Sequence, residues 1–276
     1  MNANGLQIFA KSGLVPVRSE PTHTTALMTM LLHGEVAEIL SIRENWIQII
    51  TSNEGWIGWV EKEAVEILPP DQFSPFPQDE SVVRWPYFSM HLKVSKNQLF
   101  MPTGGIVCDR VDHFSLWNGC ELPWPAADPL KQSTIIETAR NFAGVPYLFG
   151  GRTDTGIDAG GFIQTLHLLH HLSLPRDYRQ QVAVKAFTAD NIQHAEPASL
   201  IYFSDENSEI THVGFCLGDG AVVHASGSVK IENIEFSKRF DSKYPFNQRL
   251  AETVAGIQSP VTEGDTIIPV GESALS

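Results

Sequence analysis

The sequence predicts an α+β fold in which strand-rich modules precede a domain of helices and strands. Up to about residue 122, apolar residues form short alternating runs separated by turn residues, a pattern typical of small β-barrels. After Leu130, two stretches carry apolar residues at helical spacing, and further alternating runs follow them. Helices followed by antiparallel strands indicate an α+β domain.

The strand-rich part divides into two modules. Residues 1–70 contain runs such as VPVR, WIQIIT and GWIGWV, and we assign them to a first barrel. Residues 71–127 begin with a proline-rich stretch and continue with shorter runs, which we interpret as a linker and a second barrel.

The α+β domain is expected over residues 128–256. Its first helix should bury one face, made by Ile135, Ile136, Ala139 and Phe142. A second helix is predicted within AGGFIQTLHLLHHL, after a glycine-rich turn. Residues 257–276 hold three acids and no bases among Gly, Pro and Ser, so we expect a flexible tail.

Composition limits the classes of partner. The formal net charge of −13 argues against nucleic acid and against an anionic membrane, because both require basic patches. Three cysteines without CxxC spacing favour a reducing compartment. The first residues lack a basic region followed by an apolar one, so we expect a cytoplasmic protein without a secretory signal.

Four segments of the α+β domain occur in the order found in one family of cysteine peptidases. They are GVPYLFGGRTDTGIDAGGFIQ (144–164), LPRDYRQQ (174–181), PASLIYFS (197–204) and ITHVGFCLGDGAVVHASG (210–227). The domain resembles the NlpC-type (NlpC/p60) peptidases, which implies a papain-like fold. The region before it resembles the bacterial SH3-like barrels of the branch that releases dipeptides, so both barrels are expected to be SH3-like.

The resemblance places an alanine at the position of the nucleophile. Where the family has Asp-Cys-Ser-Gly, this chain has Asp158, Ala159, Gly160 and Gly161. A cysteine at a helix N-terminus has a lowered pKa because the unpaired N–H groups stabilise its thiolate. The methyl group of Ala159 can neither ionise nor attack a carbonyl. Gly160 also removes the hydroxyl expected in the substrate pocket.

The other catalytic positions are kept. By resemblance, His212 is the base and His224 is the residue that orients it. Asp158 stands where a helix N-cap belongs, and a role as the cap is at least as well supported as a substrate contact. Asp177, in LPRD, matches a substrate-contacting position of some relatives, and the alternative is a solvated loop acid.

The resemblance of the first barrel implies a clamp for the ligand's amino terminus. In the dipeptide-releasing branch, a glutamate and an aromatic residue grip the free ammonium of L-Ala in L-Ala-γ-D-Glu-diamino-acid peptides. Glu20 and Trp56 are the matching positions. A carboxylate beside an ammonium forms a charge-assisted contact. Trp56 stands where relatives often have tyrosine, and a place in the barrel core is an equal alternative.

Two other patterns are given structural roles. His167, His170 and His171 have a spacing that could bring two imidazoles to a metal, but no acidic or cysteine partner is indicated, so we expect no metal and no cofactor. Cys216 could face the same way as His212, yet it lacks a helix N-terminus, and we interpret it as a core residue.

Three functions remain open from the sequence. The first is a degenerate hydrolase that binds cell-wall-derived peptides with a free N-terminal L-Ala and does not cleave them. The second is an active γ-D-glutamyl-diamino-acid dipeptidyl peptidase whose cysteine has been replaced. The third is a structural or protein-interaction module. The pair Ala198-Ser199, where the family usually has Gly-Asp, adds to the departures and favours the first.

Overall fold

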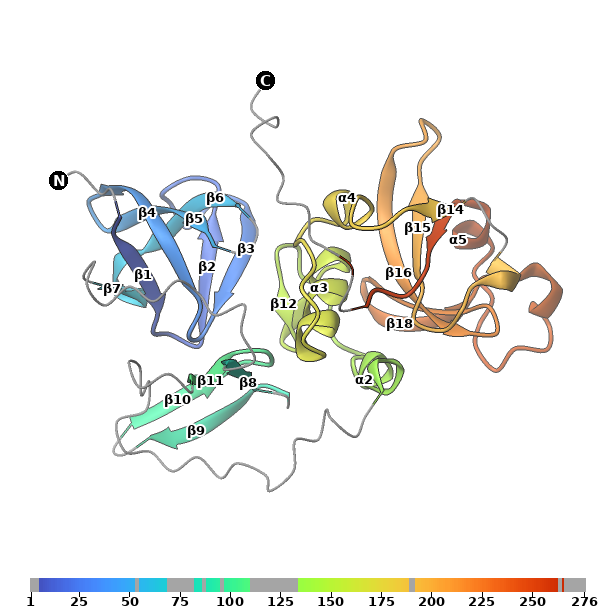
Figure 1. The fold of residues 1–276 in the computed structure, drawn as a ribbon, viewed down its shortest axis with the longest axis horizontal. Helices are drawn as coiled ribbons and strands as arrows, with labels where there is room; N and C mark the ends of the chain where they lie inside the picture. Colours follow the sequence, from blue (N-terminus) through green and yellow to red (C-terminus); the bar gives the residue numbers. More distant parts are fainter. Residues whose placement is uncertain are drawn as a thin grey trace. The chain divides into compact units, whose positions relative to one another are not determined.

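The computed structural model describes residues 5–52, 55–68, 82–85, 88–94, 97–109, 134–188, 192–262 and 265. The chain forms two units, each described by itself. Unit 1 comprises residues 1–129 and also Phe149–Asp154, and unit 2 comprises residues 130–148 and 155–276. Figure 1 shows the strands of unit 1 and the mixed helices and strands of unit 2.

Unit 1 begins with an antiparallel, SH3-like sheet of seven strands. Their order in the sheet is β3-β2-β6-β5-β4-β1-β7. The strands are β1 (Gln7–Ala10), β2 (Leu14–Arg18), β3 (Leu27–Leu32), β4 (Val36–Arg43), β5 (Trp46–Thr51), β6 (Ile57–Glu61) and β7 (Val65–Leu68), with a short 3-10 helix, η1 (Lys62–Ala64), before β7. Burial alternates along β5, where Ile47 and Ile49 are buried, because successive side chains point to opposite faces.

The rest of unit 1 consists of short strands. Its elements are β8 (Val82–Arg84), β9 (Met90–Val94), β10 (Asn97–Met101), β11 (Ile106–Asp109) and β12 (Arg152–Thr153). Strands β8 and β11 pair with each other, and so do β9 and β10. The described residues of the second module therefore form two separate strand pairs, and a closed second barrel stays a prediction. The expected linker at 71–80 and the boundary at 127 lie outside the described residues.

Unit 2 contains helices and a six-stranded antiparallel sheet, as expected for an α+β domain. The sheet order is β14-β19-β15-β16-β17-β18. The elements are α2 (Ile135–Asn141), β13 (Gly156–Ile157), α3 (Ala159–Leu169), α4 (Tyr178–Gln181), β14 (Phe187–Thr188), η3 (Ile192–His194), β15 (Leu200–Ser204), β16 (Ile210–Gly218), β17 (Ala221–Ser226), β18 (Ser228–Asn233), η4 (Phe236–Lys238), α5 (Gln248–Glu252) and β19 (Val254–Gln258).

Helix α3 is the central helix of unit 2. Its side chains are almost all buried, and it packs against β16 and β17. Helix α2 begins after Thr134, which forms a capping box with Glu137. Of its predicted buried face, Ala139 and Phe142 are buried. Phe142 makes an edge-to-face contact with Phe162 of α3, which joins the two helices.

The tail prediction is wrong at its start. Ile257 and Gln258 belong to β19, where both are buried, and Val261 is buried after them. The side chain of Gln258 donates to the backbone oxygen of Lys185, at 2.6 Å. The first two residues of the expected tail therefore belong to the sheet, where they pair with Ile201 and Leu200. Among the described residues, none of the helices has the length and apolarity needed to span a membrane.

Candidate functional site

The N-terminal turn of α3 (residues 158–161) places Ala159 at the first helical position. Asp158 is the N-cap, and its Oδ1 accepts a hydrogen bond from the Gly161 amide at 2.8 Å. Ala159 is 5% exposed. Its methyl group therefore stands where the helix N-terminus would stabilise a thiolate, and it offers no nucleophile there.

The carboxylate of Asp158 forms a buried ion pair with Arg176. Arg176 donates from Nη1 to Oδ1 at 2.8 Å and from Nη2 to Oδ2 at 2.6 Å, and both residues are buried. This bidentate geometry is the strong form of an arginine–carboxylate contact. Both oxygens of Asp158 already have protein donors, so its observed role is to cap the helix and to hold Arg176.

Sequence reasoning missed Arg176. A carboxylate that is buried at a helix start requires a compensating cation, because an isolated buried charge is very unfavourable. That requirement was a usable signal, since Arg176 stands beside Asp177 in a segment already expected near the site.

Gly160 lies directly under the loop that carries Arg176. A Cβ atom at position 160 would come within 2.5 Å of the backbone oxygen of Arg176. The Gln181 side chain holds the same loop, donating from Nε2 to the oxygens of Gly160 (3.0 Å) and Pro175 (2.7 Å). The serine expected here would not fit without a shift of this loop.

Asp177 caps the next helix. Its Oδ1 accepts from the Arg179 amide at 2.9 Å and also lies 3.4 Å from Nε of the exposed Arg179 side chain. A contact between Asp177 and a substrate stays a prediction. Its observed role is that of the N-cap of α4.

The two predicted catalytic histidines meet in a hydrogen-bonded chain, which we call the histidine network: His212, His224, Glu232 and Asn247. His212 Nε2 lies 3.0 Å from His224 Nδ1, and His224 Nε2 lies 2.8 Å from Glu232 Oε2. Asn247 Nδ2 donates to the same Glu232 oxygen at 2.7 Å. Strands β16 and β17 carry the histidines, and both strands pack against α3.

The carboxylate fixes the tautomers of this network. Glu232 can only accept when ionised, so His224 must donate from Nε2, and its Nδ1 is then an acceptor. His212 in turn donates from Nε2, which leaves its Nδ1 as the basic nitrogen. Hydrogen bonds and nearby charges lower the pKa of Glu232 although partial burial opposes this, which agrees with an ionised carboxylate.

Burial keeps both histidines neutral. Desolvation, with a smaller contribution from the neighbouring imidazole of His224, lowers the pKa of His212 to about 3. Desolvation also lowers the pKa of His224, and the hydrogen bond to Glu232 opposes that change only in part. His212 is therefore neutral at pH 7, and its Nδ1 is the unprotonated ring nitrogen.

Glu232 and Asn247 were not found from the sequence. Glu232 lies on β18, whose register pairs His224 with Lys230 and Val222 with Glu232. Residues 230 and 232 therefore share the face of His224, and the diagonal neighbour reaches its ring. The alternation of the run KIENIEF was the available signal.

The predicted clamp residues lie in unit 1. Glu20 is exposed, in the turn between β2 and β3, and its backbone oxygen accepts from Thr25 Oγ1 at 3.2 Å. Trp56 directly precedes β6 and is half-buried, and its amide donates to Thr51 Oγ1 at 3.0 Å. The buried indole Nε1 of Trp56 has no hydrogen-bond partner among the described residues. The clamp itself stays a prediction.

His167 in the last turn of α3 and the C-cap residue His170 both have structural partners. His167 Nδ1 lies 2.8 Å from the Ile163 oxygen, and burial lowers the pKa of His167 to about 4. His170 Nε2 lies 2.8 Å from Thr138 Oγ1. Within the described ranges, no group of three His, Cys, Asp or Glu residues is placed to hold a metal ion.

Cys216 and Ala198 occupy structural positions in unit 2. Cys216 is buried on the sheet, where desolvation raises the pKa of its thiol, so it is poorly suited to act as a nucleophile. Cys120 lies outside the described residues. Ala198 has a φ of 73°, a left-handed conformation that favours glycine, which explains why the family has glycine there.

Comparison with known proteins supports the resemblance. Residues 144–248 match the NlpC/P60 family, and residues 17–65 match the bacterial dipeptidyl-peptidase SH3 domain. A gamma-D-glutamyl-L-lysine dipeptidyl-peptidase from Bacillus cereus is 23% identical over 74% of this chain and 68% of its own length. The protein of the same description from Bacillus subtilis is 23% identical over 72% of each chain.

A solved structure shares the fold. An NlpC/P60 family protein from Bacillus cereus has a TM-score of 0.69 at 16% identity, over 91% of this chain and 98% of its own. At this identity the likeness concerns the fold alone. The chain therefore contains an NlpC/P60 domain and a bacterial SH3 domain, and it is homologous to the gamma-D-glutamyl-L-lysine dipeptidyl-peptidases of a peptidoglycan-peptide hydrolase family.

Proposed function

We propose that this protein binds peptidoglycan-derived peptides and does not hydrolyse them by the cysteine mechanism. The observation that carries the proposal is Ala159 at the first position of α3, while the histidine network keeps its hydrogen bonds. Without a nucleophile, no acyl-enzyme can form, and loss of the nucleophile from such a constellation lowers kcat by several orders of magnitude.

The proposed ligand is a peptide of the L-Ala-γ-D-Glu-diamino-acid type with a free amino terminus. The relatives from both Bacillus species are described as acting on gamma-D-glutamyl-L-lysine substrates, which supports this class. Glu20 would attract the ammonium group, because its carboxylate is exposed. The half-buried ring of Trp56 would supply an apolar wall beside that group.

The alternative of a peptidase with one replaced residue is less well supported. A single replacement at position 159 does not explain Gly160. The loop of Arg176 fills the space that a side chain at position 160 would need. The substitution at 159 and the close approach at 160 concern adjacent residues, and together they favour natural loss of activity. We also propose that the protein binds peptides that reach the cytoplasm, in line with the expectation from its sequence.

Calorimetric titration with L-Ala-γ-D-Glu-diaminopimelate, paired with an assay for released dipeptide, tests the proposal. We expect saturable binding without release of L-Ala-γ-D-Glu. Glu20→Gln should weaken binding, and Glu44→Gln, which changes another exposed acid of unit 1, should not. No binding at roughly millimolar ligand would reject the peptide-binding role. Dipeptide release by the unchanged protein would reject the loss of hydrolysis.

A further inference from the structure

Six residues of the NlpC/P60 domain lie in unit 1. Phe149–Asp154 belong to that unit, whereas the chain on both sides of them belongs to unit 2. The ends of the excursion are tied together inside unit 2, where the Leu148 amide donates to the Ile157 oxygen at 3.1 Å and the Ile157 amide donates to the Pro146 oxygen at 3.0 Å. We call Phe149–Asp154 the anchor segment.

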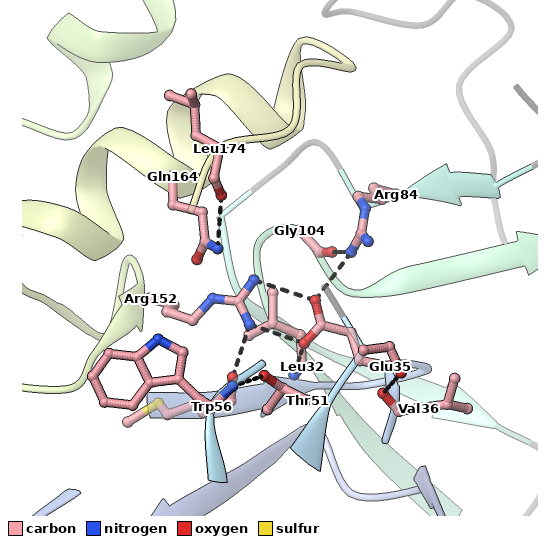
Figure 2. Close-up of polar contacts among 12 residues, drawn as sticks. Leu32, Glu35, Val36, Thr51, Trp56, Arg84, Gly104, Arg152, Gln164 and Leu174 are labelled. Atoms are coloured by element: carbon pink, nitrogen blue, oxygen red, sulfur yellow. Dashed lines mark hydrogen bonds and ion pairs between the residues drawn. The ribbon is translucent and has the colours of Figure 1, made fainter. Parts of the chain in front are cut away.

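A buried ion pair fixes the middle of the anchor segment. Arg152 donates from Nη1 to Glu35 Oε2 at 2.9 Å and from Nη2 to Glu35 Oε1 at 3.3 Å (Figure 2). Arg152 is 3% exposed and Glu35 is 4% exposed. Arg152 Nη1 also donates to the Met30 backbone oxygen at 2.8 Å, so the guanidinium is tied to strand β3 as well.

Glu35 is itself held from two other sides. The Leu32 amide donates to its Oε2 at 2.9 Å, and Arg84 Nη1 lies 3.4 Å from its Oε1. Arg84 Nη1 also donates to the Gly104 oxygen at 2.8 Å. Burial alone would raise the pKa of Glu35, but the charges of the two arginines hold it below its usual value. The carboxylate is therefore ionised and links the first sheet, the second module and the anchor segment (Figure 2).

Both ends of the anchor segment have further contacts within unit 1. Asp154 accepts from the Ser89 amide at 2.9 Å, from Thr103 Oγ1 at 2.7 Å and from the Ser89 hydroxyl. Gly150 has a φ of 80°, and a Cβ atom there would come within 2.6 Å of the Leu27 oxygen. Glycine thus lets the segment approach β3 closely.

We propose that Glu35 is a positioning residue for the N-terminal turn of α3, which it acts on through Arg152. Only residues 155–157 separate the anchor segment from the N-cap Asp158. A chain this short transmits a displacement of Asp154 to Asp158, because each residue spans at most ~3.6 Å. Loss of the Glu35–Arg152 pair is therefore expected to alter the backbone at residues 158–161 through this short connection. This inference rests on the proposed function only where it concerns peptide affinity.

Hydrogen exchange on the full chain tests this positioning role without any ligand. We compare Glu35→Gln with Glu38→Gln, which changes an exposed acid of the neighbouring strand β4. Glu35→Gln keeps the shape of the side chain but removes the charge between two arginines. We expect amides 157–162 to exchange at least tenfold faster, and the amides of Val213 and Phe215 in the central sheet of unit 2 to keep their protection. The control should change neither set.

Asp154→Asn provides a second variant at the other end of the segment. It weakens the contacts to Ser89 and Thr103, so exchange of amides 157–162 should rise by a smaller factor. The inference can therefore still be tested if Glu35→Gln does not fold. Unchanged protection of 157–162 in the folded variants would overturn the inference. An equal loss of exchange protection at the amides of Val213 and Phe215 would also overturn it, because that result would mean general destabilisation. Failure of the parent protein to bind peptide would reject the proposed function and leave this exchange result intact.

Discussion

The N-terminal turn of α3 and the histidine network hold the residues that the resemblance assigns to a catalytic site, and the two regions differ in the chemical groups that they contain. The turn carries only a methyl group at Ala159, and Gly160 lies against the loop of Arg176, which the Gln181 side chain holds. The network keeps two neutral imidazoles, a carboxylate and an amide in one hydrogen-bonded chain. The two regions also differ in the number of unpaired polar atoms that a substitution in each of them would create.

Replacing a thiol with a methyl group leaves no buried polar atom without a partner. Removing Glu232, by contrast, would leave two donors without the oxygen that accepts from them. These donors are Nε2 of the buried His224 ring and Nδ2 of Asn247. An unsatisfied buried polar group costs about 1–3 kcal/mol of stability. Removal of a network member should therefore cost stability, whereas the methyl group of Ala159 is accommodated in the buried start of α3.

Acid should destabilise the α+β domain strongly, because helix α3 and the histidine network each hold a buried neutral histidine. The pKa of His167, in α3, is about 4 and that of His212, in the network, is about 3, while both lie near 6.5 in the unfolded chain. The folded state cannot take up the protons that the unfolded state binds, so this stability is complete above pH 6.5 and is lost as pH falls. We expect a loss of about 5 kcal/mol between pH 6.5 and 4.5.

Urea unfolding at a series of pH values measures this loss. His212→Asn should remove about half of the pH dependence, and His167→Gln should remove the other half. His171→Asn, which changes an exposed histidine at the end of the same helix, serves as the control. Equal pH dependence in all three variants and the parent would show that the buried imidazoles are not the source.

The ion pair at the start of α3 should matter almost as much. Arg176→Ala leaves the buried carboxylate of Asp158 without its cation, and breaking one side of a buried pair costs about 3–5 kcal/mol. Chemical denaturation of Arg176→Ala and of the exposed control Arg179→Ala measures the difference. The double variant Asp158→Asn with Arg176→Met should recover part of the loss. A loss below about 1 kcal/mol for Arg176→Ala would contradict a buried, charged pair.

The sequence predicted the parts of both regions that depend on local pattern. A cap residue before an apolar run located the start of α3, and alternation located the strands that carry the two histidines. The flexible-tail prediction was wrong at its start because Ile257 and Gln258 pair with a strand from far earlier in the chain. Local composition carries no information about such a pairing.

The residues that the sequence analysis did not identify were missed for one physical reason. Arg176 reaches Asp158 through the path of a loop, and Arg152 reaches Glu35 across 117 positions of sequence. Each pair is required by burial of a charge, yet the partner is chosen by tertiary structure. Sequence reasoning can state that a buried acid needs a cation, but it cannot select which cation without the fold.

A side chain at position 160 should have an intermediate effect on stability. In Gly160→Ser the new Cβ would meet the Arg176 oxygen at 2.5 Å, and overpacking of this kind costs about 1–3 kcal/mol. Thermal unfolding should show a Tm lower by roughly 2–4 °C for each kcal/mol. Gly160→Ala is the matched control for the hydroxyl, and it should lose as much because the conflict is at Cβ. An unchanged Tm in both variants would mean that the loop moves freely.

Restoring the thiol should have the smallest effect. Ala159→Cys supplies a nucleophile at the helix N-terminus, but it does not return the residue-160 side chain or move the loop held by Gln181. We therefore expect release of L-Ala-γ-D-Glu to rise by less than about tenfold over the parent, equivalent to about 1.4 kcal/mol of activation free energy. Dipeptide release from L-Ala-γ-D-Glu-diaminopimelate measures this rise.

The second substitution His212→Ala identifies the origin of any activity that Ala159→Cys acquires. If the network activates the new thiol, the double variant should fall back to the rate of the parent, because His212 supplies the basic nitrogen. A rise of about a thousandfold that depends on His212 would contradict natural loss, since one substitution would then separate this chain from a working peptidase. A small rise in dipeptide release that depends on His212 would support the network as a working base. It would also mean that restoring the thiol is not enough to make the N-terminal turn of α3 fully active.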